Sequence, residues 1–138
     1  MPSGYSGTPL YKKLGLKEGL SIRLIHAPEH YHSLTGLSRD HQKAPEKAGG
    51  LDFIHLFTNS REELERLLPE LKATLSKQGM IWVSWYKKSS GKPSELSDNA
   101  VRDTALAVGL VDVKVCAVDE DWSGLKLVFR RYDRLPIK

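Results

Sequence analysis

The sequence is poor in cysteine and has no long apolar run. Cys116 is its single cysteine among 138 residues, so no intramolecular disulfide can form, and the protein suits a reducing compartment. No apolar stretch approaches the roughly 20 residues that a membrane-spanning helix needs, and the first residues have no apolar signal core. We therefore expect a cytoplasmic protein that does not insert into a membrane.

Motifs that define common enzymes and metal proteins are also missing. There is no nucleophile elbow, no His-Glu-x-x-His zinc motif and no paired-cysteine motif. The glycines, hydroxyls and lysines of GYSGTPLYKK (4–13) resemble a phosphate loop, but this segment precedes the first expected strand and lacks the terminal Gly-Lys-Ser/Thr. His26, His30 and His32 match no zinc spacing, so we predict no metal site and no catalytic residue.

The charge is only mildly basic. The chain has 21 Lys and Arg against 17 Asp and Glu, a net charge of +4, and the two signs are interspersed. This excess favours anions weakly and is too small to indicate nucleic acid.

Apolar segments of strand length alternate with helical patterns. Residues 21–26 (SIRLIH) and 80–85 (MIWVSW) read as strands, and 51–58 (LDFIHLFT) is apolar at nearly every position, which predicts a strand covered on both faces. His55 in that strand is expected to be a hydrogen-bonded core histidine, and Cys116 to be a core residue. Residues 1–138 are long enough for one domain with its own core.

The first long helix begins with a capping box, Ser60 and Glu63. Pro69 should kink this helix and Gly79 should end it. One apolar stripe runs along the helix: Leu64, Leu67, Leu68, Leu71 and Leu75.

The second helix is expected from Ser97, its cap, to about Val108, with Gly109 as its stop. Leu96 and Val101 fall at the positions of a hydrophobic staple.

Two further segments complete the fold. Val111 to Val118 and Leu125 to Arg131 alternate apolar and polar residues and predict an antiparallel C-terminal edge hairpin, joined by Asp119 to Gly124. Residues 1–20 form an N-terminal arm with a short helix that Gly15 closes, and residues 29–50 a polar connection with a short helix near 31–37. We predict an α/β, Rossmann-like fold with a mostly parallel sheet of about five strands flanked by helices.

The segment LGLKEGLSIRLIHAP (14–28) resembles the entry to the first strand of class I methyltransferases, which hold S-adenosylmethionine in a glycine loop. His26, Ala27 and Pro28 stand where that loop would be, and Pro28 has no N–H to donate. Residues 29–50 replace the next two strands of that family, and no strand-terminal acid remains for a ribose. The resemblance implies the fold in a degenerate form; we expect no cofactor and no S-adenosylmethionine binding in the usual mode.

A second resemblance covers most of the chain. The segments GYSGTPLYKKLG, LDFIHLFT, WVSWYKK and GLVDVKVCAVDEDWSGLKLV are similar to bacterial proteins of the domain of unknown function 3052 family. Tyr86 stands where that family's pattern has proline. The resemblance implies an α/β domain and no assigned reaction.

Ligands of open α/β sheets bind beyond the carboxyl ends of the parallel strands. Those ends place polar groups, lysines and indoles along one rim, which the N-terminal GYSG could cover; the Asp119 to Gly124 turn joins this rim if its strand runs parallel to the others. The commoner role of such tryptophans is that of packing anchors, and that of such charged groups is a solvated turn. The candidate ligand-binding residues are His26, Thr58, Trp85, Lys87, Lys88, Asp119, Trp122 and Ser123.

Three functions are compatible with these patterns. The first, which we favour, is a non-catalytic domain that binds a small anionic ligand or a protein partner. The second is an enzyme that uses the rim residues. The third is a single-stranded nucleic-acid binder in which Trp85, Tyr86, Lys87 and Lys88 stack on bases and hold phosphates, although the modest charge argues against it. The sequence does not fix an oligomeric state.

Overall fold

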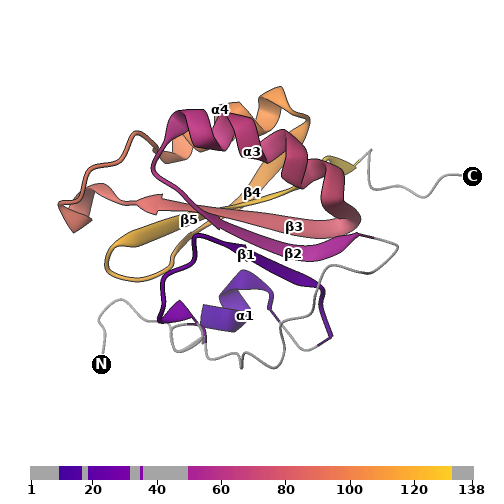
Figure 1. Ribbon diagram of the computed structural model, residues 1–138, viewed down its shortest axis with the longest axis horizontal. Coiled ribbons are helices and arrows are strands. Elements are labelled where there is room, and N and C mark those ends of the chain that lie inside the picture. Colours follow the sequence, from indigo (N-terminus) through magenta and orange to yellow (C-terminus); the bar gives the residue numbers. More distant parts are fainter. Residues whose placement is uncertain (1–9, 17–18, 32–34, 36–49, 132–138) are drawn as a thin grey trace, which may run out of the picture.

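Five strands form the centre of the structure: β1 (Ile22–Ile25), β2 (Leu51–Phe57), β3 (Leu75–Tyr86), β4 (Leu110–Ala117) and β5 (Trp122–Phe129). They make one sheet in the order β1-β2-β3-β5-β4 (Figure 1). The strands β1, β2 and β3 are parallel, and β5 runs antiparallel to both β3 and β4. The coordinates come from a computed structural model that describes residues 10–16, 19–31, 35 and 50–131.

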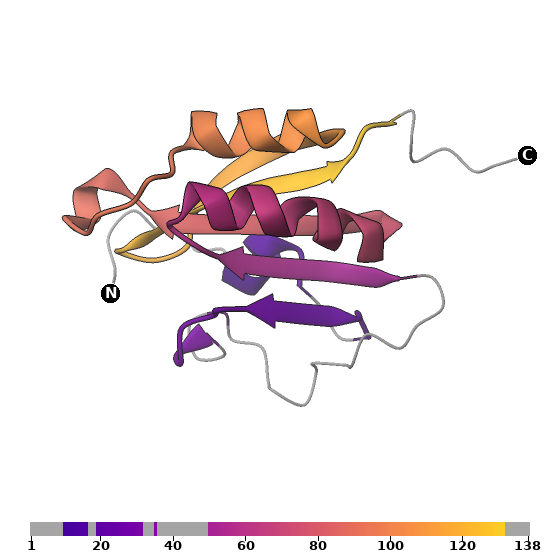
Figure 2. The same cartoon turned by 45° about the horizontal axis from the view of Figure 1, so that its top comes forward.

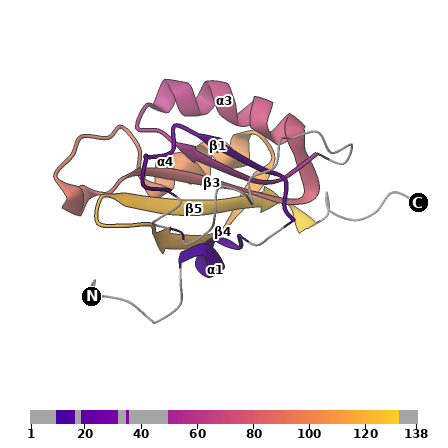
Figure 3. The same cartoon turned by 60° about the horizontal axis from the view of Figure 1, so that its bottom comes forward.

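Helices cover both faces of the sheet. The helices α3 (Arg61–Thr74) and α4 (Asp98–Ala107) lie on one face, and α1 (Leu10–Leu14) lies on the other (Figures 1 and 3). A short 3-10 turn, η2 (Lys88–Ser90), follows β3. The predicted α/β fold, with a mostly parallel sheet and an antiparallel C-terminal hairpin, is therefore confirmed.

The strand β2 is buried on both faces, as its apolar run predicts. Ile54 and Leu56 belong to the core cluster shared with α3 and α4. Phe53 and Phe57 belong to the cluster on the α1 side. This alternation is what a strand between two helical layers requires, because successive side chains point to opposite faces.

A buried histidine stands in the middle of β2. The side chain of His55 is 0% exposed; its Nδ1 lies 2.8 Å from the Tyr31 hydroxyl and its Nε2 lies 2.8 Å from Ser84 Oγ. The ring also stacks on Phe57 at a centroid distance of 4.2 Å. A neutral imidazole donates from one nitrogen and accepts at the other, so this site satisfies the neutral form. The prediction of a hydrogen-bonded core histidine is confirmed, and burial lowers the pKa of His55 to about 3.

The boundary between α3 and β3 differs from the prediction. The helix ends at Thr74, and β3 begins at Leu75, which pairs with Leu51 of β2. Gly79, predicted to end the helix, lies inside β3 at a register shift; a Cβ there would come within 2.8 Å of the Leu51 carbonyl oxygen. The glycine therefore permits a close approach of two strands at a bulge, which sequence alone did not distinguish from a helix stop. The helix continues through Pro69.

The helix α4 has the predicted ends. Ser97 Oγ accepts a hydrogen bond from the backbone N–H of Ala100 at 3.2 Å, which caps the helix. Gly109 follows the helix with a φ of +89°, a conformation that favours glycine. Leu96 and Val101, the predicted staple, are both buried in the cluster beneath α3 and α4.

The C-terminal hairpin is tighter than predicted. Trp122, Ser123 and Gly124, assigned to the turn from sequence, are part of β5. The reason lies in Asp119, whose Oδ1 accepts hydrogen bonds from the backbone N–H groups of Asp121 and Trp122, both at 2.8 Å, and so closes a short turn. Because β4 and β3 are both antiparallel to β5, this turn lies at the same end of the sheet as the carboxyl end of β3.

Some predictions fall on residues that are not described. These are the arm 1–9, most of the polar connection 29–50 and most of the short helix 31–37. One domain spanning 1–138 stays a prediction. Within the described ranges, no helix has the length and apolar character needed to cross a membrane.

We predict that His55 makes the protein acid-sensitive. The pKa is about 3 when folded and 6.5 when unfolded, so the unfolded state binds the proton more tightly between these values. The stability that the folded protein gains from a neutral His55 is complete above pH 6.5 and is lost as the pH falls toward 3. Urea denaturation should show the free energy of unfolding decreasing by roughly 2 kcal/mol between pH 6.5 and 4.5 on this account.

In His55→Gln this part of the acid dependence should disappear, although the variant is less stable at pH 7. The matched control is His30→Gln, which alters a histidine with a side chain 56% exposed and should keep the wild-type slope. Equal slopes in wild type and His55→Gln would contradict the prediction.

Candidate functional site

The carboxyl ends of the parallel strands and the β4–β5 turn form one rim, as the sequence predicted. The backbone N–H of Thr58, after β2, donates to the Ser84 carbonyl at 3.0 Å. The backbone N–H of Lys87, after β3, donates to the Asp121 carbonyl at 2.9 Å. The ends of β2, β3 and the hairpin are therefore held together by main-chain hydrogen bonds.

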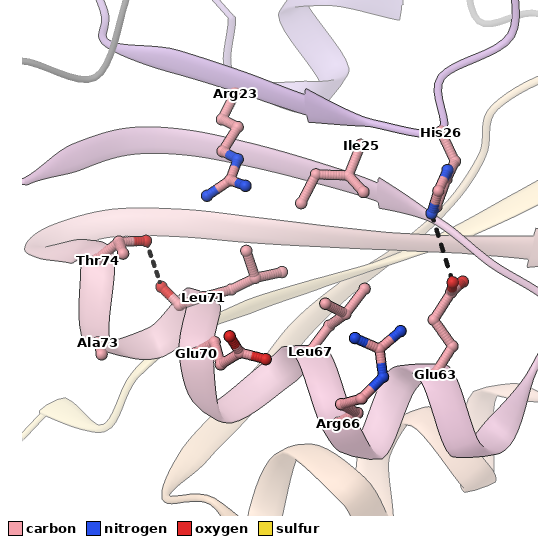
Figure 4. A pocket seen from close by; sticks show the side chains of 10 residues that line it. All are labelled: Arg23, Ile25, His26, Glu63, Arg66, Leu67, Glu70, Leu71, Ala73 and Thr74. Atoms are coloured by element: carbon pink, nitrogen blue, oxygen red, sulfur yellow. Dashed lines mark hydrogen bonds and ion pairs between the residues drawn. The ribbon is translucent and has the colours of Figure 1, made fainter.

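His26 ends β1 in an unusual backbone conformation. Its φ is +58°, and it is the one non-glycine residue with positive φ among the described residues. That region is sparsely populated by side-chain-bearing residues, with histidine among the more tolerant. The imidazole Nε2 lies 3.4 Å from Glu63 Oε2 at the start of α3 (Figure 4). His26 thus adopts a glycine-like backbone while its side chain bridges toward the helix.

Glu63 joins the ends of the first two strands. Its Oε1 accepts a hydrogen bond from the Thr58 hydroxyl at 2.5 Å, while its Oε2 faces His26. The predicted capping box is only half formed, because Ser60 Oγ accepts from the Glu63 N–H at 3.1 Å but the Ser60 N–H donates to Thr58 Oγ1 at 3.2 Å. Glu63 was interpreted from sequence as a cap; the preceding threonine diverts its carboxylate into the rim.

Asn59, which follows Thr58 at the end of β2, ties β2 to β3. Its Oδ1 accepts from the backbone N–H of Tyr86 at 2.7 Å, and its carbonyl accepts from the Glu95 N–H at 3.0 Å. Glu95 Oε1 in turn accepts from the Arg61 N–H at 2.9 Å. Glu95 and Ser60 therefore occupy N–H groups at the start of α3, where an anion could otherwise bind.

The acids of the hairpin turn have partners of their own. Asp119 Oδ2 lies 3.3 Å from His30 Nε2, in addition to its bonds within the turn. Asp121 Oδ2 accepts from Lys92 Nζ at 2.8 Å, and this hydrogen bond raises the pKa of the lysine. Lys92 also lies over the Tyr86 ring, 5.2 Å from its centroid. Both carboxylates are therefore engaged with nitrogen groups of neighbouring side chains.

The lysines after β3 are different. Lys87 is half-buried and Lys88 is exposed, and neither ammonium group forms an ion pair or hydrogen bond with another described residue. Trp122 follows in β5 beside them and is half-buried. Its ring centroid lies 4.4 Å from that of Tyr86 and 4.9 Å from that of Phe57. The rim thus carries two uncompensated cations next to an aromatic pair.

The remaining candidates take less accessible positions. Trp85 is 5% exposed and Trp82 is 0% exposed, so both pack in the core, as the packing interpretation of the tryptophans predicted. Thr58, 4% exposed, is occupied by Glu63. Ser123 is half-buried in β5, directly opposite Trp85 in the antiparallel register.

The three histidines considered as zinc ligands from sequence are not brought together among the described residues. His26 faces Glu63 and His30 faces Asp119, while His32 lies outside the described residues. No cluster of three metal-ligating side chains occurs in the described part of the chain. Cys116 is 8% exposed and packs in the cluster with Leu14; burial raises the pKa of its thiol. Its interpretation as a core residue is confirmed.

Sequence comparison identifies one family. Residues 46–131 match the model of a family described as "Protein of unknown function (DUF3052)". A search of the curated proteins finds no match to this sequence.

Structural comparison finds methyltransferases. A SAM-dependent methyltransferase from Aquifex aeolicus has a TM-score of 0.58 and 18% identity, over 84% of this chain and 85% of its own. Ribosomal protein L11 methylase from Lactobacillus delbrueckii subsp. bulgaricus has a TM-score of 0.57 and 12% identity, over 87% and 74%. Magnesium protoporphyrin IX methyltransferase from Synechocystis PCC 6803, solved with bound SAM, has a TM-score of 0.56 and 10% identity, over 82% and 71%. At these identities the comparison establishes the methyltransferase-like fold.

We predict that Glu63 stabilises the fold through its contacts with Thr58 and His26. Glu63→Ala should lower the free energy of unfolding by about 1 kcal/mol more than Glu62→Ala, as measured by urea denaturation. Both variants remove one carboxylate from the first turn of α3, so the helix-dipole effect is matched and the difference reports the rim contacts. Equal losses would show that the carboxylate acts only on the helix.

Proposed function

Because the chain belongs to the DUF3052 family of proteins of unknown function, its role must be inferred from its own residues, and we propose a non-catalytic binding domain on a methyltransferase-like scaffold. In this proposal the rim binds a small anionic ligand, and S-adenosylmethionine is not held in the usual mode.

The contact of His26 with Glu63 is the main support for this proposal. The backbone after β1 has the left-handed turn of a glycine, but it carries an imidazole directed at the carboxylate that also holds Thr58. The methyltransferase cradle uses the bare backbone of this turn to approach its cofactor. Here Pro28 lacks an N–H, and its carbonyl accepts from the Tyr31 N–H at 3.0 Å. The residues present therefore do not fit the cofactor in that mode.

Lys87 and Lys88 support the anion-binding part. The acids closest to them in the hairpin turn are already engaged, so the two ammonium groups leave a local positive charge. Lysine acts on carboxylate or phosphate as a point charge. With Trp122 and Ser123 beside them, they can offer an anion two cations, a hydroxyl and an aromatic edge. The rim around this site would then be formed and supported by His26, Thr58, Trp85 and Asp119.

The alternatives have less support. A rim enzyme needs convergent reactive groups, whereas His26 and Asp119 each face a different partner. A nucleic-acid binder would stack bases on exposed rings, but Trp85 is in the core.

Isothermal titration calorimetry tests the cofactor part of the proposal. S-adenosylmethionine and S-adenosylhomocysteine should give no saturable heat with the folded protein at concentrations up to about 1 mM, because the turn after β1 is blocked. A methyltransferase of the same fold serves as the positive control. Micromolar affinity for either compound would contradict the proposal.

A second experiment tests the rim. Inorganic phosphate should shift the backbone amide resonances of Lys88, Ser90 and Ser123 in ¹⁵N NMR, and the shifts should decrease with added salt. In the double variant Lys87→Gln with Lys88→Gln the saturable shifts should vanish. Lys77→Gln, which changes an exposed lysine on another part of β3, is the matched control. Unchanged shifts in the double variant would remove the rim as the binding site.

A further inference from the structure

A groove runs along the edge of the sheet between β1 and α3 (Figure 4). It has a volume of about 610 Å³, within the range of about 300–1,000 Å³ that small-ligand sites occupy. Ile25 of β1 and Leu67 and Leu71 of α3 supply its apolar surface. The His26–Glu63 contact lies at one end, and Thr74 lies at the other.

The groove exists because β1 is the last strand of the described sheet. No described strand pairs with the outer side of β1, and α3 lies over β2 and β3 (Figure 2). The side chains between β1 and α3 therefore line an open groove.

Two arginines point into the groove from opposite walls. Arg23 comes from β1 and Arg66 from α3, and their guanidinium groups both face the space between the two elements (Figure 4). Neither forms an ion pair or hydrogen bond with another described residue, whereas Arg61 on the same helix pairs with Glu65 at 3.2 Å. Each guanidinium group therefore keeps N–H donors that an anion in the groove could use.

The acids of the groove form no ion pair with these cations. Both oxygens of Glu63 are directed elsewhere, to Thr58 and to His26. Glu70 is the remaining carboxylate of the lining, and it has no ion-pair partner among the described residues. Its negative charge disfavours a ligand with several phosphates.

We propose that this groove binds a small phosphate monoester with an apolar body. A phosphate monoester carries a charge of about −1.5 to −2 at pH 7, enough to neutralise both guanidinium groups. Two of its oxygens at a time can accept the paired N–H groups of an arginine in a bidentate contact. A carboxylate would neutralise only one of them. The apolar body packs against Ile25, Leu67 and Leu71, which gives the site a preference over inorganic phosphate.

This site goes beyond the proposed rim function and uses different cations. The rim depends on Lys87 and Lys88 after β3, while the groove depends on Arg23 and Arg66. Failure of one site therefore leaves the other intact, and variants distinguish the two.

Phenyl phosphate is the probe. Calorimetry with the whole chain should give saturable binding, and inorganic phosphate should bind at least about tenfold more weakly, because it lacks the apolar body. Arg23→Gln and Arg66→Gln should each weaken phenyl phosphate binding by about tenfold, as expected on loss of one charge-assisted contact. Both residues are exposed, so the variants should keep the wild-type circular dichroism and denaturation midpoint.

Two controls define the site. Arg61→Gln removes one positive charge from the same helix outside the groove and should leave the affinity unchanged. Lys88→Gln removes a cation of the rim and should leave unchanged the part of the binding that Arg23→Gln and Arg66→Gln weaken. The proposal is overturned if either groove variant binds phenyl phosphate like wild type, if Lys88→Gln abolishes binding, or if benzoate binds as tightly as phenyl phosphate.

Discussion

A buried imidazole determines how the layers of this protein are joined. His55 lies at the centre of β2 with no exposed surface, and both ring nitrogens need partners because an unsatisfied buried polar group is costly. Tyr31 supplies one partner from the segment after β1, and Ser84 supplies the other from β3. These contacts fix the segment after β1 against the sheet and match the register of β2 to β3, so the rim that follows each strand is positioned by a bond deep in the core.

Above this core, the rim is held by contacts among its own polar groups. Glu63 satisfies Thr58 and faces His26, Asn59 holds the end of β3, and Glu95 and Ser60 occupy the start of α3. In a cofactor-binding α/β protein, backbone and side-chain groups at these positions are held ready for a ligand. Here each is directed to a neighbour, which stabilises the rim and leaves the lysines after β3 as its free charges. In this methyltransferase-like fold, polar groups at the ends of the strands thus stabilise the rim itself.

Much of the fold was predictable because its signals are local. The apolar run of β2, the cap at Ser97 and the turn at Gly109 each report on residues close in sequence. The misassigned features depend on distant partners. Gly79 permits the approach of Leu51, and the carboxylate of Glu63 lies between the nearby Thr58 and His26, which is far away in sequence. The partner of Asn59 could not be read from the sequence, since it is the backbone N–H of Tyr86; a proline at position 86 has no N–H and could not make that bond.

The same reasoning explains why the groove could not be predicted from the sequence. Arg23 and Arg66 are separated by the whole connection to β2, and each alone reads as an ordinary solvated charge. They line the same groove only because β1 pairs directly with β2 and has no described neighbour on its other side. A methyltransferase-like sheet with further strands beyond β1 would bury this edge. The open edge of β1 therefore leaves both guanidinium groups beside the same groove.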